Sequence, residues 1–170
     1  PPAHLVLDGR NQRTTTYLPP RDADRERNEG KLLSAADVDL VRELTGIDQW
    51  FPGSPKTLQA LRGKVVLLDF WAMWCGPCFD AFPALAEWHR DQGPDGLVIL
   101  GITRYYGQSG GIQMDNPNEI AFLKAFKDKH GLPYDFVVAK DQSSQQLYGA
   151  TGLPTAVLID RKGVIRYIES

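Results

Sequence analysis

From residue 65 onward, short apolar runs alternate with amphipathic segments, and this order restricts the folds open to the chain. The continuous apolar runs predict buried strands over residues 65–70, 97–103, 135–139 and 155–159. Helices are expected between them, over about 75–92, from Asn116 onward and over 144–148. Strand–helix–strand units pair in parallel, whereas the turn Arg161–Gly163 predicts an antiparallel last strand, 164–168. The sequence therefore predicts an α/β domain with a central mixed sheet flanked by helices.

The composition excludes several classes of function. The 170 residues carry a formal net charge of −2 without a block of lysine and arginine, so neither nucleic acid nor an anionic membrane surface is an expected partner. No apolar stretch reaches the roughly 18 residues that a membrane-spanning helix needs. The chain contains only two cysteines, which rules out a scaffold of structural disulfides. This profile is typical of a globular protein in water.

The first part of the chain is less regular than the rest. Residues 1–49 are expected to form an N-terminal extension that is partly irregular and contains one short helix, from Ser34 to Gly46. Residues 50–170 are expected to form the α/β domain. Because the chain begins at Pro1 with neither methionine nor a signal-peptide pattern, we expect a processed chain from which any targeting segment has been removed.

The two cysteines, Cys75 and Cys78, lie three positions apart at the start of the helix expected over 75–92. The unpaired N–H groups and the dipole at a helix N-terminus stabilise a thiolate. Thiol–disulfide exchange needs such a thiolate beside a second thiol that resolves the mixed disulfide. Pro77 fits the first turn, where its missing N–H is no loss. The spacing predicts a redox pair in which Cys75 attacks and a more buried Cys78 resolves.

Zinc sites also use cysteines at this spacing. A site with four ligands would need a second pair, and the other candidates, His4, His89 and His130, are scattered without ligand spacing. Each is expected to be a surface or partly buried histidine. Neither a metal nor another cofactor is therefore expected. The apolar positions along the same helix are expected to serve packing, namely Phe79, Phe82, Leu85 and Trp88.

Three segments resemble those of thioredoxins. The segment Asp69–Cys78, with the sequence DFWAMWCGPC, is similar to their active-site segment and differs mainly at Met73. Pro83 matches the proline within the helix that follows. The residues Gly152-Leu153-Pro154-Thr155 resemble the loop that carries the cis-proline of that family. The resemblance covers about residues 65–168 and implies a thioredoxin-like fold and thiol–disulfide oxidoreductase activity.

The resemblance also implies roles for residues near the cysteines. Asp69 is expected beneath Cys78, where burial raises the pKa of its carboxyl group and lets it exchange a proton with the resolving thiol. The peptide bond before Pro154 is expected to be cis. The alternatives are a capping or salt-bridged Asp69 and a trans turn at Pro154. Substrate contacts, including backbone pairing at Leu153 with an extended segment, are expected from Trp74, Gly76, Pro77, Leu153 and Pro154.

The order of segments further resembles the TlpA/ResA-like proteins. An N-terminal lead-in, the long stretch before Asp135 and the ending Val157–Gly163 carry this likeness. Those proteins are extracytoplasmic bacterial oxidoreductases. The likeness thus implies a periplasmic or membrane-tethered protein that reduces protein disulfides and takes electrons from an upstream thiol donor. Asp69 departs from the group, where asparagine is common, and matches thioredoxin, so a cytoplasmic location is the alternative.

Two other functions compete with disulfide reduction. A thiol peroxidase of the peroxiredoxin type would need the pattern P-x-x-x-[ST]-x-x-C, whereas Trp71-Ala72-Met73-Trp74 precedes Cys75. A non-catalytic thioredoxin-like interaction module would not need both cysteines. The loop 104–118 is expected to be either a partner-specific lip near the active site or a flexible connection. Since the chain stops at Ser170, the domain is expected to lack the final helix of thioredoxin-like domains.

Overall fold

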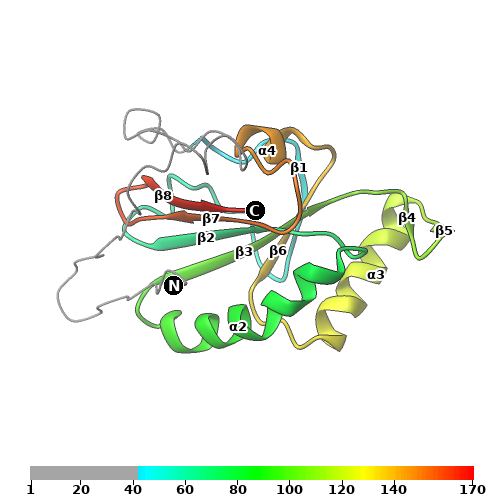
Figure 1. The fold of residues 1–170 in the computed structure, drawn as a ribbon, viewed down its shortest axis with the longest axis horizontal. Helices are drawn as coiled ribbons and strands as arrows, with labels where there is room; N and C mark the ends of the chain where they lie inside the picture. Colours follow the sequence, from blue (N-terminus) through cyan, green and yellow to red (C-terminus); the bar gives the residue numbers. More distant parts are fainter. Residues whose placement is uncertain (1–41) are drawn as a thin grey trace, which may run out of the picture.

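A computed structural model describes residues 42–170 of the chain (Figure 1). The short strands expected near the N-terminus and most of the helix expected over 34–46 lie outside these residues. The last residues of that expected helix, 42–46, are described and are not helical, because they lead directly into a strand.

The centre of the fold is a six-stranded mixed sheet, as the sequence predicts. Its spatial order is β1-β6-β3-β2-β7-β8. The strands β2, β3 and β6 run parallel, and β1, β7 and β8 pair antiparallel with their neighbours. The bounds, in chain order, are β1 Ile47–Phe51, β2 Val65–Phe70, β3 Leu97–Arg104, β6 Asp135–Ala139, β7 Thr155–Ile159 and β8 Ile165–Glu169.

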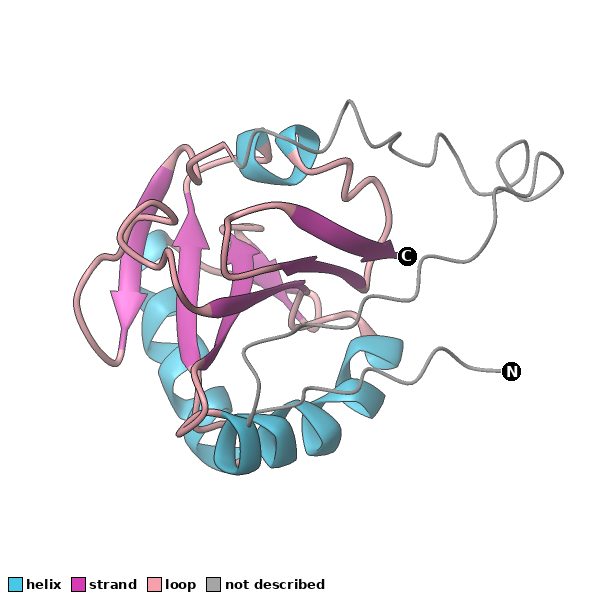
Figure 2. Cartoon of the chain, turned by 90° about the vertical axis from the view of Figure 1, so that its left-hand side faces the viewer, coloured by secondary structure: helices cyan, strands magenta, loops and turns pink. Residues whose placement is uncertain are grey.

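Helices cover both faces of this sheet. Figure 1 and Figure 2 show α2 and α3 on one face and the short α4 on the other. A small hairpin of two strands lies between β3 and α3. The bounds of these elements are α2 Gly76–Gln92, β4 Gln108–Ser109, β5 Ile112–Gln113, α3 Asn116–Lys129 and α4 Ser143–Leu147. No helix of residues 42–170 is both long and apolar enough to cross a membrane.

Alternation along β2 divides its side chains between two buried clusters. Val65 and Leu67 pack with residues of α2 and α3, whereas Val66, Leu68 and Phe70 pack on the opposite face. Since successive strand side chains point to opposite faces, residue 69 faces the same side as Val65 and Leu67. The central strands β2 and β6 are buried on both faces, and this explains why their sequences are nearly continuous apolar runs.

Three expectations about the elements can be compared with the structure. The domain boundary expected between residues 49 and 50 falls within β1, whose residues pair with β6, so the sheet begins at Ile47. The side chain of Trp88 is 42% exposed rather than packed in the core. The loop 104–118 contains the β4–β5 hairpin, because Gly110 and Gly111 both adopt the positive φ values that a tight turn requires.

Candidate active site

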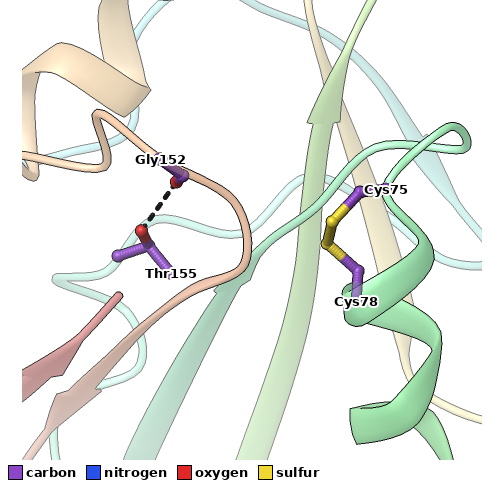
Figure 3. The surroundings of a disulfide bond; sticks show 4 residues. All are labelled: Cys75, Cys78, Gly152 and Thr155. Atoms are coloured by element: carbon purple, nitrogen blue, oxygen red, sulfur yellow. Dashed lines mark hydrogen bonds between the residues drawn. A yellow bond between two sulfur atoms is a disulfide. The ribbon is translucent and has the colours of Figure 1, made fainter.

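The two cysteines lie at the start of α2, after the short segment that follows β2. Cys75 has extended backbone angles and is the N-cap of α2, and Pro77 lies in the first turn. The N–H of Cys78 donates to the carbonyl oxygen of Cys75 over 3.1 Å. The two residues form a disulfide with their Cα atoms 5.4 Å apart (Figure 3). Cys75 therefore lies at the positive end of the α2 dipole, although its side chain accepts no capping hydrogen bond.

The disulfide is almost completely buried, and its neighbours form an exposed rim. Cys75 is 3% and Cys78 is 1% exposed. The expected order of burial, with Cys78 deeper than Cys75, is therefore only slight in this oxidised state. The side chain of Trp74 is 57% exposed, and Gly76 and Pro77 are exposed as well. A partner approaching the disulfide would meet this rim first.

The loop before β7 lies at the same end of the sheet as the disulfide. The peptide bond between Leu153 and Pro154 is cis, as the sequence predicts. The Thr155 hydroxyl donates to the Gly152 carbonyl oxygen over 2.8 Å and closes the loop (Figure 3). Thr155 pairs with Phe70, the last residue of β2, which places the loop beside the segment leading to Cys75. The half-buried Leu153 packs against the cluster that contains both cysteines.

Asp69 is a buried acid on the cysteine side of the sheet. Its side chain shares a face with Val65 and Leu67, and that cluster also contains Cys78. Asp69 is 4% exposed, and burial raises its pKa to about 7. Among residues 42–170 its Oδ2 has no hydrogen-bond partner, so neither a cap nor a salt bridge occupies that oxygen. A carboxyl group with this pKa can accept or release a proton near neutral pH.

This pKa predicts how the stability of the oxidised protein depends on pH. A folded carboxyl pKa above the unfolded value means that the folded state binds the proton more tightly between pH 4 and 7. Stability contributed by the neutral acid is therefore lost as the pH rises through that range. We expect the Asp69→Asn variant to gain roughly 3 kcal/mol relative to wild type between pH 4 and pH 8. Urea unfolding at both pH values measures this difference.

The matched control is Asp91→Asn, since the Asp91 side chain is half exposed and lies in the last turn of α2. Its stability relative to wild type should change by less than about 0.5 kcal/mol over the same pH range. Equal pH dependence for wild type and Asp69→Asn would contradict the raised pKa of Asp69.

The start of the loop 104–118 borders the exposed rim. The rings of Tyr106 and Trp74 meet edge to face, with centroids 5.3 Å apart. The guanidinium group of Arg104 lies 4.1 Å from the centroid of the Tyr106 ring. The carboxylate of Glu119, which is fully buried, accepts the N–H groups of Tyr106 over 2.8 Å and Gly107 over 3.0 Å. This part of the loop is thus fixed beside Trp74.

Sequence reasoning did not identify Glu119 as a residue that holds the lip. Its position three residues after Asn116 suggested only a helix start, and the N-cap of α3 is in fact Asp115, whose side chain accepts the N–H of Asn118. In the described part of the chain, no three His, Cys, Asp or Glu side chains gather as possible metal ligands.

The chain is similar in sequence to known thiol-disulfide oxidoreductases. ResA of Bacillus thuringiensis (strain Al Hakam), a thiol-disulfide oxidoreductase, is 30% identical over 113 residues, which cover 66% of this chain and 58% of that protein. The match covers about three fifths of the length of the YneN and ResA relatives and 18% of the length of the DipZ proteins of Mycobacterium.

Solved structures share the fold. A thiol-disulfide isomerase from Corynebacterium glutamicum matches with a TM-score of 0.64 and 25% identity, over 77% of this chain and 85% of that one. The exposed lipoprotein thioredoxin of Streptococcus pneumoniae strain TIGR4 matches with a TM-score of 0.55 and 27% identity, over 75% and 87%.

The family assignment rests on the domain as a whole. Residues 41–168 match the AhpC/TSA family, and this range includes the complete sheet up to β8, the cysteine pair and the cis-proline loop. Together with the relatives above, this match places the cysteine pair in a group of thioredoxin-like redox proteins. The chain belongs to the AhpC/TSA family and is a thioredoxin-like homologue of thiol-disulfide oxidoreductases.

Proposed function

We propose that this protein reduces disulfide bonds in other proteins by cycling Cys75 and Cys78 between dithiol and disulfide. The observation that carries the proposal is the cysteine pair at the N-terminus of α2, with a buried acid on the same side of the sheet and a cis-proline loop at the same end of it. Each part supplies one requirement of thiol–disulfide exchange: a stabilised thiolate, a proton acceptor and a place for the substrate backbone.

The catalytic cycle starts from the dithiol form. The Cys75 thiolate attacks one sulfur of the substrate disulfide, a mixed disulfide forms, and the other substrate sulfur leaves as a thiolate. The Cys78 thiol then gives its proton to the Asp69 carboxylate, and its sulfur attacks the sulfur of Cys75. This step forms the Cys75–Cys78 disulfide and releases the second substrate thiolate. An upstream thiol donor restores the dithiol.

The substrate-binding rim consists of Trp74, Gly76 and Pro77 on one side and Leu153 and Pro154 on the other. Exposure of Trp74 next to a buried disulfide supports a polypeptide substrate, because tryptophan is enriched among the residues that carry binding energy at protein interfaces. The fixed contact of Tyr106 with Trp74 extends this surface toward α3. We propose that the lip, defined as residues 104–107, contacts the protein substrate.

The location that fits this proposal is outside the cytoplasm of a bacterium, either in the periplasm or tethered to a membrane. Support comes from relatives of that kind, since one structural match is described as an exposed lipoprotein thioredoxin. A reductant in that compartment depends on an electron donor, because the surroundings keep thiols oxidised.

Insulin reduction tests the proposal and the rim together. With dithiothreitol as electron donor, the wild-type protein should reduce insulin, and Trp74→Ala should raise the KM for insulin about tenfold. The same variant should reduce a small aromatic disulfide at a rate within about twofold of wild type. Trp88→Ala is the matched control, since Trp88 is also exposed but lies near the far end of α2. No insulin reduction by wild type would contradict the function, and equal effects of both variants would contradict the rim.

A further inference from the structure

Within residues 42–170, five buried side-chain atoms have no hydrogen-bond partner. They are Asp69 Oδ2, Trp71 Nε1, His89 Nδ1, Thr103 Oγ1 and Tyr134 Oη. All five belong to the side of the sheet that α2 and α3 cover, since strand alternation places Asp69 and Thr103 there and His89 is part of α2. Buried polar atoms that no protein group satisfies are normally bridged by ordered water. We call these five atoms, which all lie in the layer that contains the cysteines, the polar seam.

Gly101 lies beside Asp69 in the sheet, and its lack of a side chain lets the ring of Trp71 approach the strand. Asp69 on β2, Gly101 on β3 and Phe136 on β6 are register partners in one row across the sheet. A Cβ atom on Gly101 would lie 3.1 Å from the Phe136 ring and 3.2 Å from Trp71 Nε1. The indole N–H of Trp71 therefore lies close against Gly101, the register partner of Asp69.

Tyr134 and His89 extend the seam away from the cysteines. Tyr134 is fully buried, and its ring lies 5.9 Å from that of Phe136 and 6.3 Å from that of His89, between centroids. Burial and, after it, the negative charge of Asp69 raise the pKa of Tyr134, which indicates that the two groups interact. His89 is half-buried and its Nδ1 atom is buried, so the residue reaches from the interior to the surface.

One further charged group faces Tyr134. The ammonium of Lys127 on α3 lies 5.9 Å from the centroid of the Tyr134 ring. It donates a hydrogen bond to the carbonyl oxygen of Leu132. Lys127 thus has a partner of its own and approaches the face of the ring rather than the hydroxyl. The buried hydroxyl of Tyr134 is left without a hydrogen-bond partner among the described residues.

We propose that Tyr134 and His89, bridged by internal water, conduct the proton between Asp69 and the surface. This inference rests on the proposed function and adds a proton path to it. When Cys78 attacks Cys75, the thiol proton passes to the Asp69 carboxylate, which is then a neutral acid with 4% exposure. That proton moves to the Tyr134 hydroxyl oxygen while the hydroxyl hydrogen moves to His89 Nδ1. The imidazolium then loses its Nε2 proton to solvent, and rotation of the hydroxyl and a change of imidazole tautomer return Tyr134 and His89 to their starting forms.

The test follows the resolving step of the full chain. Reduced protein is mixed with glutathione disulfide, acid-quenched, and analysed by mass spectrometry for the glutathione adduct of Cys75 and for the Cys75–Cys78 disulfide. At about pH 6 burial keeps most of Asp69 as the neutral acid, which must lose its proton along this path before it can accept the proton of Cys78. Tyr134→Phe should therefore slow conversion of the adduct to the disulfide about tenfold at that pH. The equilibrium ratio of disulfide to dithiol should change less than twofold. His89→Ala should slow the step similarly, and added imidazole should restore it, which a packing defect would not allow.

Two comparisons separate the path from other causes. Tyr148→Phe is the matched control, because Tyr148 is buried on the opposite face and its hydroxyl donates to the Arg42 carbonyl oxygen. It should resolve at the wild-type rate. In an Asp69→Asn background, Tyr134→Phe should cause no further slowing, since the two residues act in series.

A wild-type resolving rate in Tyr134→Phe would overturn the proton path and leave the oxidoreductase function intact. An undiminished effect of Tyr134→Phe in the Asp69→Asn background would also overturn it. If wild-type protein formed neither adduct nor disulfide, the function itself would fail, and the path with it.

Discussion

Replacing Cys75 by serine is expected to lower the rate of insulin reduction by about 1,000-fold or more. A serine hydroxyl stays protonated at neutral pH, whereas the thiol at the N-terminus of α2 is stabilised as a thiolate and can attack a disulfide. The rate with dithiothreitol, corrected for dithiothreitol alone, measures this loss. A pure interaction module would still bind its partner after this substitution, so binding and activity should separate in this variant.

Cys78→Ser is the matched control for the same experiment. Cys75 can still attack in this variant, but no second thiol can resolve the mixed disulfide. We expect a covalent complex with insulin chains that a gel without reductant retains and excess dithiothreitol releases. If Cys75→Ser instead formed the complex and Cys78→Ser did not, the roles proposed for the two cysteines would be reversed.

The largest effect on stability is expected at Trp71. Its side chain is fully buried and lies among three rings, with centroid distances of 5.5 Å to Phe82, 5.3 Å to Phe126 and 4.9 Å to Phe136. Trp71→Ala should lower the free energy of unfolding by about 3–5 kcal/mol, because it leaves a large cavity where the sheet meets α2 and α3. Urea unfolding of the oxidised protein measures the loss.

Trp88→Ala removes the same side chain from an exposed position, where 42% of the residue is accessible. It should cost less than about 1 kcal/mol. Similar losses in the two variants would contradict the different burial of the two indole rings.

The order of buried strands could be predicted from the sequence because burial on both faces leaves an unambiguous signal. Residues 135–139 are apolar apart from Asp135, and β6 has the bounds expected for it. The edge strand β1 was missed because Ile47–Phe51 contains polar side chains and is only partly buried. Its pairing with β6 depends on a contact between segments nearly 90 residues apart, which local patterns do not contain.

Some residues of the candidate site could likewise be predicted from local sequence, and others could not. Cys75, Pro77 and Cys78 were predictable, since their spacing and their place at a helix start carry the chemistry locally. Glu119, Tyr134 and His89 were not assigned to the site. Their positions depend on the path of the lip and on how α2 packs over β6. A buried glutamate that accepts two backbone N–H groups is indistinguishable in sequence from a solvated one in the first turn of a helix.

The direction of electron flow is set by how strongly the protein stabilises the Cys75 thiolate. A difference of about 30 mV in reduction potential corresponds to about 1.4 kcal/mol for this two-electron couple. The negative charge of an ionised Asp69 disfavours a thiolate on the same side of the sheet, whereas the dipole at the N-terminus of α2 favours it. The two effects on the cysteine thiolate therefore have opposite signs. The measured potential is therefore the quantity that links this site to its role.

The reduction potential of the Cys75–Cys78 pair is the decisive test of the proposal that this protein is a disulfide reductant. The purified protein is equilibrated in glutathione buffers of graded redox ratio, and the Cys75–Cys78 disulfide is quantified at each ratio. We expect a reversible intramolecular disulfide that persists until the buffer is strongly reducing, as a reductant with an upstream donor requires. Absence of that disulfide at every ratio would contradict the redox cycle itself. A disulfide lost already in mildly reducing buffer would contradict the proposed direction and indicate an oxidant or isomerase.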